Sequence, residues 1–188
     1  EGVGPYQATI AHARRCSAAH GYLRPARARH NLAVHAGAMV AGVVIVGGRA
    51  TGVRYRLGGQ ERVASARAEV ILCAGAIGSP QILMLSGIGP GAELARHGIP
   101  MRVDAPAVGA DLQDHLVVPL MWRLRDGQPS MNPRLGGARV LLEVLNYLVR
   151  KRGAMTMPAA EVGIFLRSRQ DVVRPDLQFH VLPLSGDL

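Results

Sequence analysis

The sequence predicts a fold class between α/β and α+β: part of a Rossmann-like domain with a β-meander, continuing into the start of a sheet-containing second domain. Three strand-like runs separated by glycine pairs predict the meander, and an apolar run that leads through a glycine turn into a helix predicts the Rossmann-like part. An amphipathic helix followed by two more strand-like runs predicts the second domain. We place the boundary near residue 116, which gives domains of residues 1–115 and 116–188.

The first segment, residues 1–29, predicts one short helix. Ser17 is a residue type that caps helix N-termini, and the short apolar stretch after it reaches Leu23. Pro25 is expected to end this helix, because proline has no N–H to donate and disfavours helical geometry in the residue before it.

Residues 38–66 predict three antiparallel strands. The pairs Gly47-Gly48 and Gly58-Gly59 supply the two turns, because glycine adopts the positive φ that tight hairpin turns require. In the middle strand, apolar and arginine side chains alternate, as in a strand with one buried face. The three runs are 38–46, 51–57 and 61–66.

Residues 68–74 form a continuous apolar run that is typical of a strand buried on both faces. The run ends at Gly75. Ser79 and Pro80 then predict the start of a helix over 81–86, with Ser79 as its cap and Pro80 at the first helical position. Strand, glycine turn and capped helix in this order are typical of nucleotide-binding α/β sheets.

Two more helices are predicted further along the chain. A short helix over 92–97 is followed by Gly98, which suits the left-handed position after a helix. A longer helix over 138–150 carries leucine and valine at helical spacing, and its basic end complements the helix dipole. Gly153 is expected to terminate it. Two strand-like runs follow, at 161–166 and 177–182.

The chain is basic, with 22 Lys and Arg against 13 Asp and Glu and a formal net charge of +9. The arginines are scattered and form no block of like charges, and aromatic residues make up only 4%, too few for base-stacking platforms. We therefore expect no nucleic-acid partner. A basic nucleic-acid-binding module remains an alternative, and it requires the arginines to gather on one face.

Neither a metal site nor a membrane span is expected. The histidines show no metal-ligand spacing, and Cys16 and Cys73 are isolated. The richest apolar stretch is strand-sized, well below the ~18 residues of a membrane helix. We expect a cytoplasmic protein, or one associated with a membrane through a longer parent protein.

The stretch 75–89 reads Gly-Ala-Ile-Gly-Ser-Pro-Gln-Ile-Leu-Met-Leu-Ser-Gly-Ile-Gly. It resembles the second signature of the glucose–methanol–choline (GMC) oxidoreductases at its fixed glycines, its Ser-Pro pair and its Ser-Gly-Ile-Gly end. Other blocks resemble the same family in the same order along the chain. These are 15–26, 31–34, 48–53, 86–90, 108–115, 161–165 and 175–178.

The resemblance implies FAD as cofactor and the oxidation of the CH–OH group of an alcohol, choline or another primary alcohol, by hydride transfer to the flavin. It also implies that the backbone of Val40 meets the FAD adenine, and that Ala74 and Gly75 pass close to the cofactor. Glu161 takes the position of a substrate-cavity carboxylate, which suits a cationic alcohol through charge pairing. The alternative for Glu161 is an edge-strand glutamate that faces water.

The sequence departs from the family pattern in several places. Asp111 replaces the usual Asn, and Ala107 stands where Gly is common. No Gly-x-Gly-x-x-Gly follows a predicted strand, and the family's C-terminal block with the catalytic histidine is absent. We therefore expect an internal fragment that is inactive alone, with no catalytic residue of its own and an undefined electron acceptor. A cofactor-free structural homologue is a further alternative.

Overall fold

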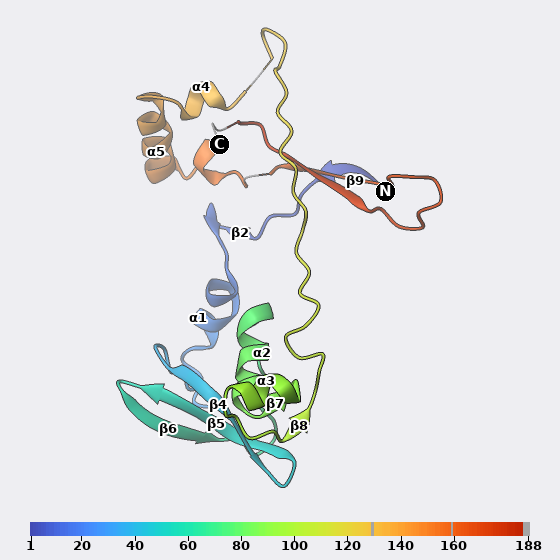
Figure 1. Cartoon of the computed structure of the whole chain (residues 1–188). Coiled ribbons are helices and arrows are strands. Elements are labelled where there is room, and N and C mark those ends of the chain that lie inside the picture. Colours follow the sequence, from blue (N-terminus) through green and yellow to red (C-terminus); the bar gives the residue numbers. More distant parts are fainter. Residues whose placement is uncertain (129, 159, 186–188) are drawn as a thin grey trace. The chain divides into compact units, whose positions relative to one another are not determined.

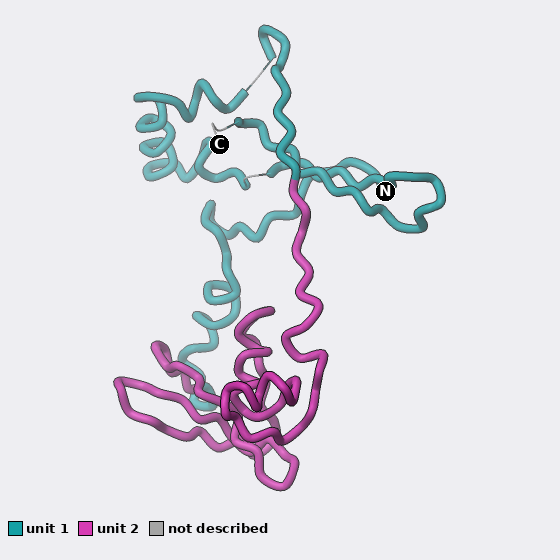
Figure 2. The backbone as a smooth tube through the Cα atoms, in the orientation of Figure 1, with its two compact units in different colours: residues 1–32, 118–188 teal, residues 33–117 magenta. Residues whose placement is uncertain are grey.

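The computed structural model describes residues 1–128, 130–158 and 160–185 (Figure 1). The chain forms two compact units (Figure 2). One unit holds residues 33–117, and the other combines residues 1–32 with 118–188. The predicted domain division at residue 116 stays a prediction, because the compact units assign the first 32 residues differently.

The centre of the unit 33–117 is an antiparallel meander of β4 (Met39–Val46), β5 (Arg49–Leu57) and β6 (Gln60–Ser65), in that order across the sheet. The glycine pairs 47–48 and 58–59 form the two turns, and all four glycines have positive φ. Two-residue turns with this geometry match the right-handed twist of the strands they connect. The predicted meander is confirmed.

Helix α2 (Gly75–Leu85) is fastened to the meander by the residue that follows it. The Ser86 hydroxyl donates to the Ile82 carbonyl, at 2.6 Å, and accepts the N–H of Val43 in β4, at 2.8 Å. Ser86 is only 7% exposed, so its hydroxyl satisfies a strand N–H where water has little access. This contact fixes α2 against β4.

Two predictions are wrong, one about the segment 68–74 before α2 and one about the start of α2. Residues 68–74 are not a strand, because no strand of the described residues lies beside them to form a ladder. Only one face of the segment is covered: Val70 and Leu72 are half-buried, whereas Ile71 is 72% exposed.

The start of α2 also differs from the prediction. The helix begins at Gly75, whose φ of +82° allows the chain to turn there, and Pro80 lies inside the helix. Ser79 is therefore not the cap. Its hydroxyl accepts the N–H of Ala74, the residue just before the helix, at 3.0 Å.

Helix α3 (Gly91–Arg96) lies between the paired strands β7 (Ile88–Gly89) and β8 (Val103–Asp104) in the chain, and these two strands run parallel. Leu94 of α3 is 1% exposed. Gly98 has a φ of +65°, as predicted for the residue after this helix.

The other unit contains a three-stranded antiparallel sheet. Its order is β1 (Gly2–Pro5), β9 (Val162–Leu166), β10 (Leu177–Val181), so that β9 is central. The two predicted C-terminal strands are confirmed. Their partner β1 comes from the opposite end of the chain and pairs with β9 from Gly2 opposite Phe165 to Pro5 opposite Val162.

Residues 10–26 contain short elements only. The predicted end of the helix at Pro25 is wrong: a π-helical turn continues directly into α1, and Pro25 lies within this helical run, at one of the first positions of α1. The elements are β2 (Ile10–Ala11), β3 (Arg14–Arg15), the π-helical turn Ala19–Leu23 and α1 (Arg24–Ala26).

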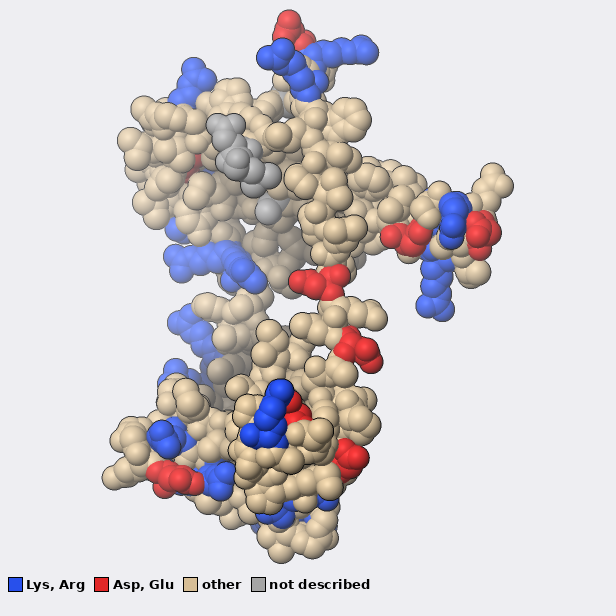
Figure 3. Space-filling view, viewed as in Figure 1, with Lys and Arg blue, Asp and Glu red and all other residues tan. Residues whose placement is uncertain are grey.

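Cationic side chains are distributed over both units. On the face drawn in Figure 3, Lys and Arg lie on many elements, with Asp and Glu among them. Pairs such as Arg54 with Glu61, 3.2 Å apart, offset part of the positive charge.

The predicted amphipathic helix is α5 (Arg139–Arg150), which follows α4 (Asn132–Leu135) and precedes a 3₁₀ turn over Ala154–Thr156. The helix ends at Arg150, as predicted, but the residue that terminates it differs. Lys151 takes the left-handed conformation after it, with a φ of +55°, so Gly153 is not its terminator.

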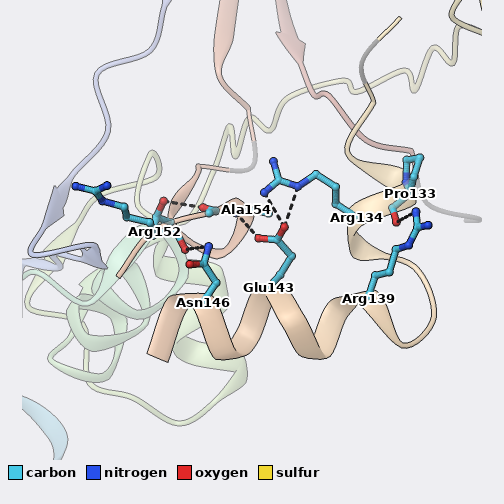
Figure 4. A network of polar contacts seen from close by, with 9 residues as sticks. Pro133, Arg134, Arg139, Glu143, Asn146, Arg152 and Ala154 are labelled. Carbon is cyan, nitrogen blue, oxygen red and sulfur yellow. Dashed lines mark hydrogen bonds and ion pairs between the residues drawn. The ribbon is translucent and has the colours of Figure 1, made fainter. Parts of the chain in front are cut away.

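A polar network connects α5 to its neighbours (Figure 4). The Glu143 carboxylate accepts from the Arg134 guanidinium at 2.6 and 2.8 Å and from the Ala154 N–H at 3.1 Å. Asn146 donates to the carbonyl of Arg152 at 3.2 Å. Gly153 has a φ of +98°, which favours glycine, and a Cβ there would lie 2.6 Å from the Glu143 carboxylate. Glu143 therefore joins α4, α5 and the 3₁₀ turn.

Replacing Ser86 by Ala removes the hydroxyl that accepts the Val43 N–H. The N–H then stays part-buried without this partner, which costs about 1–3 kcal/mol. Urea denaturation should show that loss in the free energy of unfolding. Ser65→Ala, at an exposed serine of β6, is the matched control and should change stability by less than about 0.5 kcal/mol. Equal stabilities of the two variants would show that the helix does not depend on this contact.

The Ala154 N–H and then the Arg134 guanidinium lower the pKa of Glu143 below the ordinary glutamate value of 4.5. Glu143 therefore contributes stability above pH 4.5, and this contribution is lost as pH falls through its lower pKa in the folded chain. The difference in free energy of unfolding between the wild type and Glu143→Gln should shrink as pH falls below that value. Thermal unfolding at pH 7 and at several acidic values measures it, and a constant difference contradicts the assignment.

Candidate cofactor and substrate site

Gly75 lies where the extended segment turns into α2. Its φ is +82°, and a Cβ built on it meets no atom within 4 Å. The space beside Gly75 is therefore open. Ala74 before it is exposed, and the first backbone N–H groups of α2 lie at the same end. Free N–H groups at the start of a helix of this length favour polar or anionic ligand groups.

Val40 lies near the start of β4, which is an edge strand of the meander. It is half-buried and opposite Tyr55, and the pairing shifts register between Val40 and Gly42. The outer side of β4 pairs with no strand in the part of the chain that the structure describes. The unpaired backbone N–H and C=O groups of such an edge strand can form hydrogen bonds with the edge of a planar ring.

A cavity of about 490 Å³ lies in the same unit, between β4 and the extended segment 68–74. Its walls are mostly apolar and include Val43, Ile45 and Leu72, with Arg102 as the one charged residue. None of the three predicted cofactor residues lines this cavity. We interpret the cavity as a gap in the packing between the segment 68–74 and the meander.

Glu161 belongs to the other unit and immediately precedes the central strand β9. Its carbonyl accepts the Tyr6 N–H at 2.9 Å, and its own N–H donates to the Val181 carbonyl at 3.3 Å. The residue is half-buried and held by both neighbouring strands, so it does not lie on an edge strand. These two bonds fix the backbone of Glu161 at the start of the central strand.

Tyr6 is a residue of this region that the sequence analysis did not single out. Its ring covers Gly163, where a Cβ would lie 2.5 Å from the ring. The ring stacks on His180 with centroids 5.2 Å apart, and its hydroxyl accepts from the Gln178 amide at 2.8 Å. The signal in the sequence is Gly163 itself, because a glycine inside an otherwise apolar strand marks a close approach.

The structure therefore places Val40, Ala74 and Gly75 in one unit and Glu161 in the other. Within residues 1–128, 130–158 and 160–185, His, Cys, Asp and Glu form no group able to hold a metal ion. No helix among these residues is both long enough and apolar enough to cross a bilayer.

Comparisons with known proteins agree with these observations. A curated "oxygen-dependent choline dehydrogenase" of Staphylococcus xylosus is 40% identical over 186 residues, which is 98% of this chain and 33% of that protein. An uncharacterised GMC-type oxidoreductase of Mycobacterium tuberculosis is 44% identical over 169 residues, which is 90% of this chain and 31% of that protein. The chain thus spans about a third of the length of these relatives.

Solved structures give the same result. A formate oxidase superimposes with a TM-score of 0.77 at 30% identity, covering 88% of this chain and 29% of that one. An FAD-dependent oxidoreductase from Chaetomium thermophilum gives 0.76 at 28% identity, covering 87% and 29%. These likenesses confirm the predicted fold class.

The profile of the family described as GMC oxidoreductase matches residues 1–117, more than half of the chain. The match includes the meander, the extended segment and α2, and with them the blocks of the resemblance that lie before residue 118. The chain belongs to the GMC oxidoreductase family.

Proposed function

We propose that this chain is part of an FAD-dependent oxidoreductase that oxidises the CH–OH group of choline or another primary alcohol. The observation that carries the proposal is the alignment of 98% of the chain with choline dehydrogenases, with Glu161 held at the head of a central strand. FAD-dependent enzymes among the solved structures with the same fold support the cofactor.

The residues near the start of α2 fit a flavin nucleotide. The open space beside Gly75 admits a ligand that any side chain there would obstruct, and the adjacent N–H groups suit its polar groups. The outer side of β4 at Val40 supports adenine recognition through backbone groups. When bound, FAD supplies the hydride acceptor, and the role of the chain is to hold and orient.

Glu161 supports the choice of a cationic alcohol. Glu161 is half-buried, and a partly buried carboxylate attracts a quaternary ammonium group more strongly than a fully exposed one, because less of the interaction is screened by water. Glu161 holds the substrate in place through this attraction and takes no part in its oxidation. The hydroxyl proton requires a base, which we assign to the family's histidine in a block that this sequence does not contain.

The distribution of charge supports a small-molecule function over a nucleic-acid-binding one. Arginines lie on many elements of both units with acidic residues among them (Figure 3), whereas a nucleic-acid site requires them to gather along one face. The electron acceptor stays undefined in this proposal.

Glu161→Gln tests the substrate assignment. The variant keeps the size of the side chain and removes its charge, so choline binding should weaken by about fivefold, the effect of losing one partly screened charge pair. NMR titration of the 188-residue chain measures the affinity. The neutral isostere of choline, 3,3-dimethylbutan-1-ol, is the matched control and should bind the wild type and Glu161→Gln equally. Unchanged choline affinity contradicts the assignment.

The 188-residue chain is expected to be inactive alone. With FAD, choline and an artificial electron acceptor added to the purified chain, we expect no alcohol-dependent reduction of the acceptor, because no residue of this sequence takes the role of the base. Absorbance of the acceptor measures the reaction. Turnover above that of FAD without protein would overturn the expectation and place a base within these residues.

A further inference from the structure

Tyr6 contacts all three strands of the sheet that carries Glu161. It directly follows β1, its N–H binds the carbonyl of Glu161, and its ring covers Gly163 of the central strand. The ring and the hydroxyl then reach two residues of β10. Tyr6 thus connects the three strands, through its backbone N–H at Glu161 and through its ring and hydroxyl at β9 and β10.

The Tyr6 ring lies on the face of the sheet to which a side chain at Gly163 would point. Glu161 lies two residues before Gly163, just outside β9, where its carbonyl accepts the Tyr6 N–H. Gly163 lies opposite His180 in the ladder, so His180 is on the same face as the Tyr6 ring. Glu161 also contacts β10 through its backbone, because its N–H donates to the carbonyl of Val181, the residue after His180.

The fit between Tyr6 and Gly163 is specific. With a Cβ at Gly163 only 2.5 Å from the ring, even alanine at this position forces the ring to move. Gly163 is buried, and Tyr6 is half-buried above it. The Tyr6 ring is therefore held between Gly163 of β9 and the imidazole of His180. The ring in turn restricts the movement of β9.

We propose that Tyr6 is a positioning residue for Glu161: it fixes the start of β9 and the His180 ring, and so sets where the carboxylate meets the ammonium group of a cationic alcohol. This inference rests on the proposed function, because it assigns a role in the same substrate site. Tyr6 itself acts through Glu161 and needs no contact with the substrate.

The test compares choline with its neutral isostere in four forms of the 188-residue chain. NMR titration gives both dissociation constants, and their ratio is the charge preference. Tyr6→Leu should lose the preference to the same extent as Glu161→Gln, about fivefold. The double variant should lose no more than either single variant, because both changes act through one carboxylate. A residue that only supports the fold weakens both ligands alike and leaves the ratio unchanged.

Two variants act as controls. Tyr22→Leu makes the same substitution at a tyrosine that is 80% exposed, and it should leave the preference unchanged. Tyr6→Phe keeps the ring on Gly163 and against His180, and it should retain the preference to within about twofold, because only the hydroxyl hydrogen bond is lost.

The outcomes separate the two proposals. A normal preference in Tyr6→Leu, with a lost preference in Glu161→Gln, overturns the role of Tyr6 and leaves the substrate assignment intact. An unchanged preference in Glu161→Gln overturns both. If Tyr6→Leu does not fold, Gly163→Ala decides, because it displaces the ring and keeps the tyrosine: a retained preference there overturns the inference.

Discussion

The geometry of the unit 33–117 depends on the hydrogen bonds of the Ser86 hydroxyl. This hydroxyl accepts a strand N–H and donates to a helix carbonyl, and so it joins β4 to α2 by two hydrogen bonds from one atom. Val40 lies on that strand and Gly75 begins that helix. The relative placement of Val40 and Gly75, two residues of the proposed cofactor site, therefore depends on the side chain of Ser86.

Local chemistry made much of the fold predictable. The two glycine pairs set the meander, because their positive φ is a property of the residues themselves. The segment 68–74 was not predictable in this way. Its apolar composition indicates burial, but a strand exists only where a neighbour supplies hydrogen bonds, and none is present among the described residues. Ser79 shows a related limit: its hydroxyl binds backward to Ala74 and does not begin the helix.

The candidate site was predictable only in part, and through resemblance more than through physics. Val40, Ala74, Gly75 and Glu161 were assigned by matching blocks of a family. Tyr6 was not, since its importance comes from neighbours more than 150 residues away, which no local pattern reveals. The one local sign was Gly163, whose missing side chain leaves room for the ring.

The pairing of β1 with β9 also determines the order in which the chain can assemble. The meander closes through turns of two residues and can form as soon as residue 65 is available. β1 precedes the meander in the chain, yet its partner follows about 160 residues after it, and long loops close at a greater entropic cost. During synthesis β1 therefore stays unpaired until β9 emerges, and its free N–H and C=O groups are available to a chaperone in the meantime.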